Sequence, residues 1–168
     1  MKLWRIASDT RQHSAADLSG AGAARGPGRW NNENEPVVYC STSIALAMLE
    51  TAAQIDTTGL PLNRFLVEID VPDETWAQRE EADVANLPTT WSAIPAGTGS
   101  INVGSGWLSS NRSVILLVPS VIVPEERNAL INPRHPDAHG ITANVVRPCE
   151  YDRLFRSNHR VADPQGRG

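Results

Sequence analysis

The chain has 168 residues, the length of a single domain, so a second full domain does not fit. Hydrophobic residues make up 40% of it and charged residues 20%, which is enough apolar material for a packed core and argues against a disordered or fibrous protein. The net charge of -4 argues against a general nucleic-acid binder.

Arginine is unusually frequent among the basic residues. Only Lys2 of the 15 basic residues is a lysine, so 14 are arginines. Arginine binds phosphate through two parallel hydrogen bonds, although genomic base composition can produce the same bias. Five basic and two acidic residues lie between positions 1 and 30. This acidic chain can therefore still present a local basic pocket to an anionic ligand.

The cysteines, the histidines and the amino terminus exclude several protein classes. Cys40 and Cys149 form no CxxC pair, which argues against a disulfide scaffold and a zinc ribbon. His135 and His139 have i, i+4 spacing, but Pro136 prevents the regular helix that such a metal pair needs. Neither a signal peptide nor an apolar stretch of about 20 residues is found. We therefore expect a cytoplasmic protein with no metal and no membrane segment.

The first half of the chain predicts two strands and one helix. β-prone residues indicate strands over Leu3–Ile6 and Val37–Cys40, whereas Ala15–Gly28 is rich in Ala and Gly and is expected to be a loop. From Ile44 to about Ile55 apolar residues recur at helical spacing, behind several serine and threonine N-caps. Glu50 lies on this helix, off its apolar stripe.

The second half predicts further strands between irregular segments. Arg64–Val71 alternates like a half-buried strand, and Ser113–Val118 is a continuous aliphatic run expected to be the most buried strand. Val121–Val123 is expected to form another short strand. The remaining segments are a charged surface stretch over 76–95, a Gly/Ser-rich stretch over 97–106, and a Pro-punctuated loop with a short extended part over 129–136.

This irregular order predicts an α+β fold. Regular strand-helix-strand spacing is absent, which argues against a doubly wound parallel sheet. A Rossmann nucleotide site is excluded as well, because the short glycine pairs do not complete a GxGxxG pattern between a strand and a helix. Residues 156–168 form a polar, basic tail that is expected to fray.

The loop over residues 26–32 is the richest candidate for ligand binding. Gly28 permits close backbone approach, Arg29 offers a cation, Trp30 offers a flat stacking face, and Asn31 offers both a donor and an acceptor. Such a loop can hold a nucleotide. The alternative is that Arg29 makes a surface salt bridge and Trp30 covers the core.

Glu50 and Ser120 are the other candidates for chemistry. A half-buried Glu50 near an arginine can stabilise a cationic, oxocarbenium-like transition state, whereas an exposed helical glutamate has no such role. Ser120 follows a buried strand directly after a proline, without a GxSxG setting or a histidine base. It is therefore expected to form hydrogen bonds rather than to act as a nucleophile. Cys40 is expected to be a small core residue.

Several motifs, in order, resemble one known family. LWRI, GAARGPGRWN, VVYCSTSIALAMLE and LLVPSVIVPEERNALINPRHP together resemble the RES-domain toxins of bacterial toxin-antitoxin operons. The resemblance spans residues 3 to about 155, so residues 1–155 are expected to form the RES domain. It implies a compact mixed-sheet α+β fold related to ADP-ribosyltransferases and diphtheria-like toxins. It also implies an enzyme that consumes NAD+ by cleaving the nicotinamide-ribose bond.

The resemblance implies roles for individual residues. Glu50 would stabilise charge on the ribose, Arg5 and Arg29 would hold the diphosphate, Tyr39 would contact the nicotinamide ribose, and Ser120 would fix a ribose or amide group. The expected catalytic set is Arg29, Tyr39, Glu50 and Ser120, and the expected NAD-binding set is Arg5, Gly28, Arg29, Trp30, Asn31 and Tyr39.

Other implications concern the reaction and its partners. NAD+ is the substrate, and no cofactor is bound permanently. Pro27 and Gln54 stand where the family commonly has glycine and histidine, respectively. The acceptor of ADP-ribose stays open between water, phosphate and a protein side chain, and a catalytically inactive nucleotide-binding or partner protein is the alternative of another class. The resemblance further implies a homodimer and an Xre-type antitoxin that blocks the active site and alone touches DNA.

Overall fold

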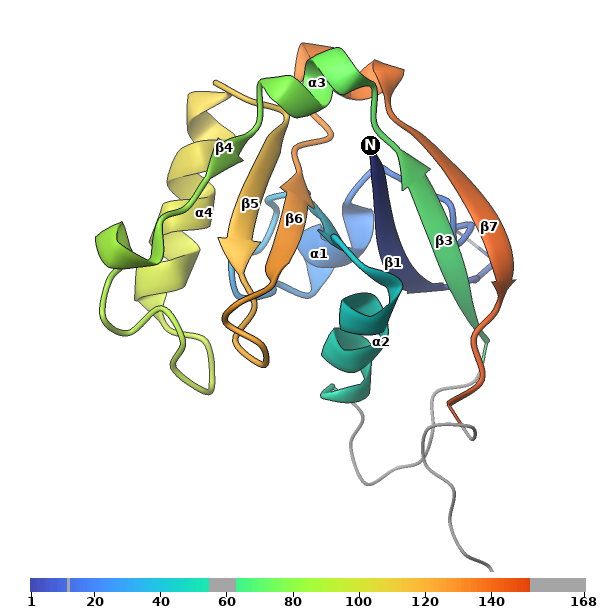
Figure 1. Cartoon of the computed structure of the whole chain (residues 1–168), viewed down its shortest axis with the longest axis horizontal. Helices are drawn as coiled ribbons and strands as arrows, with labels where there is room; N and C mark the ends of the chain where they lie inside the picture. Colours follow the sequence, from blue (N-terminus) through green and yellow to red (C-terminus); the bar gives the residue numbers. More distant parts are fainter. Residues whose placement is uncertain (12, 55–62, 152–168) are drawn as a thin grey trace, which may run out of the picture.

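The computed structural model describes residues 1–151, except residue 12 and residues 55–62. Its elements, in chain order, are β1 (Lys2–Ser8), α1 (Ala21–Arg25), β2 (Val38–Ser41), α2 (Ile44–Ala52), β3 (Arg64–Asp70), α3 (Asp73–Ala77), β4 (Glu80–Glu81), the 3-10 helix η1 (Val84–Asn86), α4 (Thr98–Ser110), β5 (Ile115–Pro119), β6 (Arg127–Ile131), the 3-10 helix η2 (Pro136–Gly140) and β7 (Thr142–Pro148). The described strands form a sheet in the order β4-β5-β6-β2-β1-β3-β7 (Figure 1). β4 and β5 are parallel and the other neighbours are antiparallel, which confirms the predicted α+β fold with a mixed sheet.

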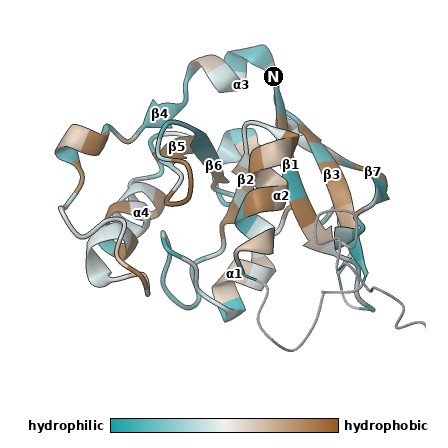
Figure 2. Cartoon of the chain, turned by 60° about the horizontal axis from the view of Figure 1, so that its bottom comes forward, coloured by the Kyte–Doolittle hydropathy of each residue, from teal (hydrophilic) through white to brown (hydrophobic). Residues whose placement is uncertain are grey.

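The sheet opens between its central strands β1 and β2. β1 pairs with β3 over seven residues, and β2 pairs with β6 over four. Between β1 and β2, by contrast, the register contains only the pair Trp4 and Ser41, so the two strands diverge toward Ser8 and Val38. α2 and α1 lie on opposite faces of the sheet at this opening (Figures 1 and 2). Backbone and side-chain groups of β1 and β2 that further strand pairing would occupy are therefore available to a binding site.

The strand β5 is buried on both faces, as predicted for the most apolar run. All five of its residues are buried. Ile115 and Leu117 join a core formed with residues of β1, β2, β3 and β6, and Leu116 and Val118 join a second core that contains the indoles of three tryptophans. This alternation follows from the two-residue period of a strand. Figure 2 shows the largely apolar colour of β3, which packs in the first core.

Most predicted regular elements are confirmed. The strands predicted over Leu3–Ile6, Val37–Cys40, Arg64–Val71 and Ser113–Val118 correspond to β1, β2, β3 and β5. The predicted helix is α2, which begins at Ile44 and ends at Ala52, whereas Ile55 lies outside the described residues. The tail over 156–168, expected to fray, also lies outside them. Within the described part of the chain, no helix is long and apolar enough to cross a membrane.

The predicted loop over Ala15–Gly28 contains a short helix, α1, so this prediction was wrong in part. The helix follows Gly20, whose φ of 70° favours glycine. A Cβ at Gly20 would lie only 2.6 Å from the backbone nitrogen of Val37, the residue before β2. This close approach, which no local pattern reveals, places α1 against the start of β2.

Of three segments in the carboxyl half, two differ from expectation and one agrees with it. Val121–Val123 is not a strand, because the Ser120 hydroxyl accepts the backbone N–H groups of Ile122 and Val123 at 3.1 and 3.0 Å and bends the chain. The segment 129–136, expected to be a loop with a short extended part, contributes its first three residues to β6 and then continues as turns, as predicted. β7 was not predicted, because six of its seven residues are exposed and show no alternating burial.

Candidate functional site

Two cavities meet at the opening between β1 and β2. The first, called the basic cavity, measures about 500 Å³ and lies between β1, the segment that follows β1, and α1. The second, called the glutamate cavity, measures about 200 Å³ and lies against α2. Both are lined by Arg5, Ile6 and Tyr39, which therefore form their junction. The two cavities are therefore neighbours on the same central strands, with chemically different linings.

Arginine side chains make the basic cavity positively charged. Arg5, Arg11 and Arg25 line it, together with the acidic residue Asp17. Arg5 donates from Nη1 to the backbone carbonyl of Asp17 at 2.9 Å, which orders the segment that closes the cavity. Three cations against one carboxylate favour an anionic ligand. The five basic residues among positions 1–30 predict such a basic pocket in this part of the chain.

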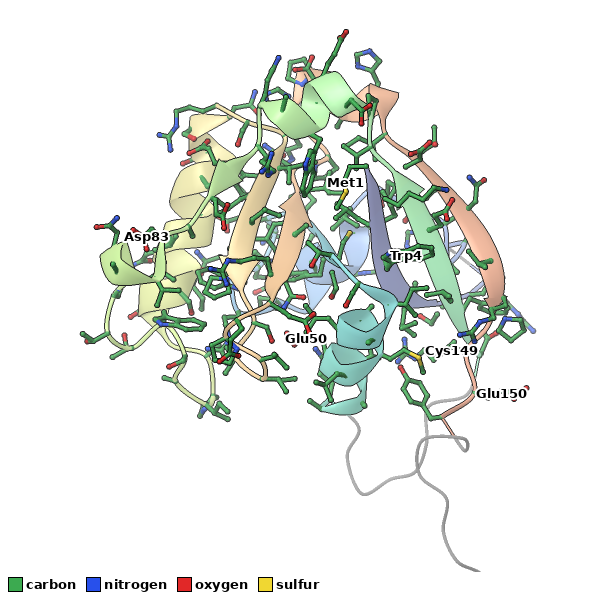
Figure 3. The ribbon with its side chains drawn as sticks, in the orientation of Figure 1. Met1, Trp4, Glu50, Asp83, Cys149 and Glu150 are labelled. Atoms are coloured by element: carbon green, nitrogen blue, oxygen red, sulfur yellow. The ribbon has the colours of Figure 1, made fainter. Side chains whose placement is uncertain are left out.

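Glu50 is the acidic residue of the glutamate cavity. It is half-buried, on the sheet-facing side of α2 (Figure 3). Its Oε1 accepts a hydrogen bond from the Ser120 hydroxyl at 2.7 Å and another from the Asn128 side-chain amide. No described residue donates to Oε2. The carboxylate is thus held through one oxygen, while the other remains for a ligand.

Sequence reasoning missed the amide that orients Glu50. Asn128 lies on β6 directly opposite Ser41 on β2, and the Ser41 hydroxyl donates to its Oδ1 at 2.7 Å. This bond turns the Nδ2 donor of Asn128 toward Glu50. Ser41 belongs to the serine-threonine string read as a helix cap, but Ser43 is the residue that caps α2, by accepting from Leu46 at 3.1 Å. Only the register of β2 and β6 brings these groups together.

Ser120 forms hydrogen bonds both to Glu50 and to the bend that follows β5. Its side chain is fully buried and lines neither cavity. The hydroxyl donates to Glu50 and accepts two backbone N–H groups of the following bend. These bonds agree with the expected hydrogen-bonding role and leave the hydroxyl no free position from which to attack a substrate.

Tyr39 is fixed at the junction by the loop that precedes β2. Its hydroxyl accepts the backbone N–H of Trp30 at 2.9 Å and donates to Asn31 Oδ1 at 2.8 Å. A Cβ on Gly28 would lie 2.6 Å from that hydroxyl, so glycine is needed for the close approach. Burial raises the pKa of Tyr39, which therefore stays protonated at neutral pH.

Trp30 and Asn31 do not line either cavity, contrary to the expectation that they bind the nucleotide. Trp30 is 3% exposed and stacks on Trp91, with ring centroids 6.4 Å apart. Asn31 is fully buried, and its amide nitrogen donates to three backbone carbonyls. The alternative reading of Trp30 as a cover for the core fits the structure. Both side chains shape the loop that positions Tyr39.

Arg29 bridges two segments beside the site. Its Nη1 donates to the carbonyls of Trp91 and Ala93, at 2.8 Å each, rather than forming the surface salt bridge of the alternative interpretation. Partial burial lowers the pKa of Arg29, and the nearby Glu50 carboxylate opposes this shift. Arg29 lines neither cavity. Its positive charge nevertheless interacts electrostatically with Glu50 and Tyr39, which do line the site.

The described residues offer no metal site. Among them, no group of three or more histidine, cysteine, aspartate or glutamate side chains is gathered closely enough to hold an ion. The i, i+4 histidines lie in and before η2, where His135 caps the turn by accepting from Asp137. Cys40 is buried, as expected of a core residue.

Comparison with known proteins relates these features to a family. The RES domain profile matches residues 2–153. A protein named Prs ADP-ribosylating toxin, from a Sphingobium species, is 58% identical over 92% of this chain and 96% of its own length. A Toxin Res from Yersinia enterocolitica is 37% identical over 80% of this chain and 86% of its own length. Another, from Pseudomonas putida, is 38% identical over 92% of this chain and all of its own length.

A solved structure shares the fold. A chain of the MbcT-MbcA toxin-antitoxin complex of M. tuberculosis superposes with a TM-score of 0.66 at 20% sequence identity. The match covers 93% of this chain and 89% of that chain. At this level of identity the likeness bears on the fold alone.

Proposed function

The chain belongs to the RES domain family, and from this premise we propose that it is the toxin of a toxin-antitoxin pair and cleaves the bond between nicotinamide and ribose in NAD+. The observation that carries the proposal is the junction of a basic cavity with a cavity that holds an oriented carboxylate. NAD+ has matching parts, namely an anionic diphosphate and a ribose that becomes cationic as nicotinamide leaves.

The substrate is proposed to span both cavities. Its adenosine diphosphate half occupies the basic cavity, where Arg5, Arg11 and Arg25 offer charge-assisted hydrogen bonds. The chain of the substrate passes Tyr39 at the junction, and the nicotinamide ribose enters the glutamate cavity. Gly28 contributes by admitting the Tyr39 hydroxyl, and Arg29 by fixing the 91–93 turn beside the site.

Glu50 supplies the chemistry in this proposal. As the bond between ribose C1′ and nicotinamide breaks, its electron pair leaves with nicotinamide and positive charge develops on the ribose. The Oε2 of Glu50 stabilises that charge, directly or through a ribose hydroxyl. Because Ser120 and Asn128 already hold Oε1, the carboxylate needs little reorganisation when the charge appears.

The acceptor of ADP-ribose distinguishes two forms of this activity. Water or phosphate would make the chain an NAD+ glycohydrolase or phosphorylase, which is the form expected from the sequence. The name of the Sphingobium relative, an ADP-ribosylating toxin that is 58% identical, favours transfer to a protein as the second candidate. Both forms share the cleavage step and differ only in what attacks ribose C1′.

The partner is proposed to be an antitoxin. The structural relative was solved as a toxin-antitoxin complex. We extend this to an Xre-type antitoxin that covers the mouth of the site and carries the contact with DNA, and to a toxin homodimer within the complex. In this setting NAD+ is consumed in the cytoplasm when the antitoxin is lost.

Product analysis tests the proposal. The purified chain is incubated with NAD+ labelled in its adenine, in buffer without phosphate, with inorganic phosphate, and with a cell extract. Release of nicotinamide is expected in at least one condition. The label then appears as ADP-ribose, as phosphorylated ADP-ribose or on protein, which identifies the acceptor. Binding of NAD+ without any release of nicotinamide would favour the inactive nucleotide-binding alternative instead.

A further inference from the structure

Arg64 is a cationic residue that lines the glutamate cavity and has no role in the proposed reaction. It is the first residue of β3, lies opposite Ser8 of β1, and lines the cavity together with Glu50 and Gln54. The Arg64 carbonyl accepts the backbone N–H of Cys149 at 2.7 Å, which fixes the main chain at this position. The residue is therefore anchored at the wall of the site rather than free on the surface.

The Arg64 guanidinium is incompletely satisfied. Its Nε is buried, yet it has no hydrogen-bond partner. No described carboxylate forms an ion pair with Arg64, and Glu50 is the acidic residue among those that line the cavity. Arg64 is nevertheless only half-buried and lines the cavity, so a ligand there that accepts hydrogen bonds would pair with the accessible part of its guanidinium.

The charge of NAD+ indicates which kind of ligand Arg64 can bind. The nicotinamide ring of NAD+ is itself cationic, so an arginine beside it is unfavourable unless an anion is also present. The Glu50 oxygens are already used, one by Ser120 and Asn128 and the other in stabilising the ribose. The basic cavity is lined by three arginines that can hold a diphosphate, one of which, Arg5, also lines the glutamate cavity. The glutamate cavity thus contains one cation more than its proposed occupant requires.

We propose that Arg64 binds a phosphate group at the Glu50 end of the site, an inference that rests on the proposed function. Two sources supply this chemistry. The group is either inorganic phosphate acting as the acceptor or the diphosphate of NAD+ bent toward β3. With inorganic phosphate, one of its oxygens forms the new bond to ribose C1′ with its own electron pair. The pair of the broken glycosidic bond leaves on the nitrogen of neutral nicotinamide.

Arg64→Gln tests the proposal, with Arg147→Gln as the matched control. Arg147 is an exposed arginine of β7 that lines neither cavity. Binding of inorganic phosphate alone is measured by calorimetry, and the KM for NAD+ is measured from nicotinamide release at a fixed, high concentration of inorganic phosphate. Arg64→Lys, which keeps the charge but lacks Nε, is added in case Arg64→Gln fails to fold, and circular dichroism checks each variant.

Two results support the proposal and identify the source. If Arg64→Gln weakens the binding of inorganic phosphate at least tenfold and leaves the KM unchanged, the ligand is free phosphate. If it raises the KM about tenfold and the wild type binds no inorganic phosphate, the ligand is the diphosphate of NAD+. A tenfold effect corresponds to about 1.4 kcal/mol, within the range of one hydrogen bond to a charged group.

One result overturns the proposal. If the folded Arg64 variants match wild type and Arg147→Gln in both measurements, Arg64 binds no phosphate at this site. Failure of the proposed function looks different, because wild type would then release no nicotinamide. In that case calorimetry with inorganic phosphate and with NAD+ still decides the role of Arg64, since neither titration requires turnover: weaker binding of either ligand in Arg64→Gln supports it, and binding of both ligands that matches wild type contradicts it.

Discussion

At the scale of single residues, the site depends on groups that hold other groups in place. Glu50 is the proposed reacting carboxylate, but Ser120 and Asn128 fix its direction, and Ser41 fixes that of Asn128. Each of the three supporting residues comes from a different strand or its end. Small errors in the position of a catalytic group can cost large factors in rate. The supporting amide should therefore matter although it is not proposed to touch the reacting bond.

Asn128→Ala should lower the kcat of nicotinamide release about tenfold to a hundredfold and leave the KM for NAD+ nearly unchanged. The reason is that Glu50 loses one of its two donors while the walls of the basic cavity stay intact. Steady-state kinetics measure the split between kcat and KM. Asn144→Ala, an exposed position on β7, is the control. Equal kcat in the two variants would remove Asn128 from the positioning role.

At the scale of elements, α4 supports the loop that holds Tyr39. The helix is rich in glycine and serine, yet it has 13 residues and buries Gly104 and Trp107. A Cβ at Gly104 would lie 1.8 Å from the backbone oxygen of Trp30, so the helix and the loop are in direct contact there. Glycine lowers helix propensity, but here it permits packing that a larger residue would prevent.

Two glycines in α4 should respond in opposite ways to the same substitution. Gly104→Ala should lower the free energy of unfolding by several kcal/mol, because the Trp30 backbone has to move away from the new Cβ. Gly106→Ala should raise it by about 0.5–1 kcal/mol, because no atom lies within 4 Å of a Cβ there and alanine favours the helix. Urea denaturation measures both. Destabilisation by both variants to the same degree would mean that helix packing at Gly104 is not the cause.

The elements that sequence could predict are those whose signal is local. The alternation in β3 and the aliphatic run of β5 follow from burial of one or both strand faces, and both were predicted. α4 was not assigned as a helix, because it is rich in glycine and serine and the close contact that Gly104 permits with the Trp30 loop cannot be seen in the sequence. β7 was missed because exposed strand residues leave no pattern. Contacts between distant segments decide these cases.

The same limit applies to the site. Four candidate residues were named from the sequence and the family resemblance. The structure places Arg5 and Tyr39 at the junction of the two cavities and joins Ser120 to Glu50 by a hydrogen bond. Asn128 could not be named, because its link to Glu50 spans 78 positions and depends on the pairing of β2 with β6. Trp30 looked like a stacking platform because a sequence does not show which face of a loop is covered.

At the scale of the whole molecule, the opening of the sheet gives a ligand access to a site that lies beside the stable core of the domain. β1 and β2 diverge at the centre of the domain, so the site lies next to the main core rather than on a peripheral loop. Cys40 on β2 lies in that core, fully buried, and burial raises the pKa of its thiol to about 12. The thiol is therefore expected to remain neutral, and unreactive, while the domain is folded.

The domain should lose stability in alkali partly through Cys40. The ordinary thiol pKa is near 8.5, so above that pH the unfolded chain releases a proton that the folded chain retains. The stabilisation is present below pH 8.5 and declines as the pH rises toward 12. Between pH 8 and pH 10 the free energy of unfolding should fall by about 1–2 kcal/mol from this group. Urea denaturation at the two pH values should show a smaller fall for Cys40→Ala, and an identical fall would contradict the assignment.

The role of the Glu50 charge is tested most directly by nicotinamide release from NAD+ in wild type, Glu50→Gln and Glu125→Gln. Glutamine keeps the shape of Glu50 and an oxygen for Ser120 and Asn128, but it removes the charge, whereas Glu125 is exposed and lines neither cavity. The expected result is release by wild type and Glu125→Gln, and a rate at least a hundredfold lower in Glu50→Gln, with unchanged thermal unfolding. Release by Glu50→Gln at the wild-type rate, or no release by the wild type, would contradict the account.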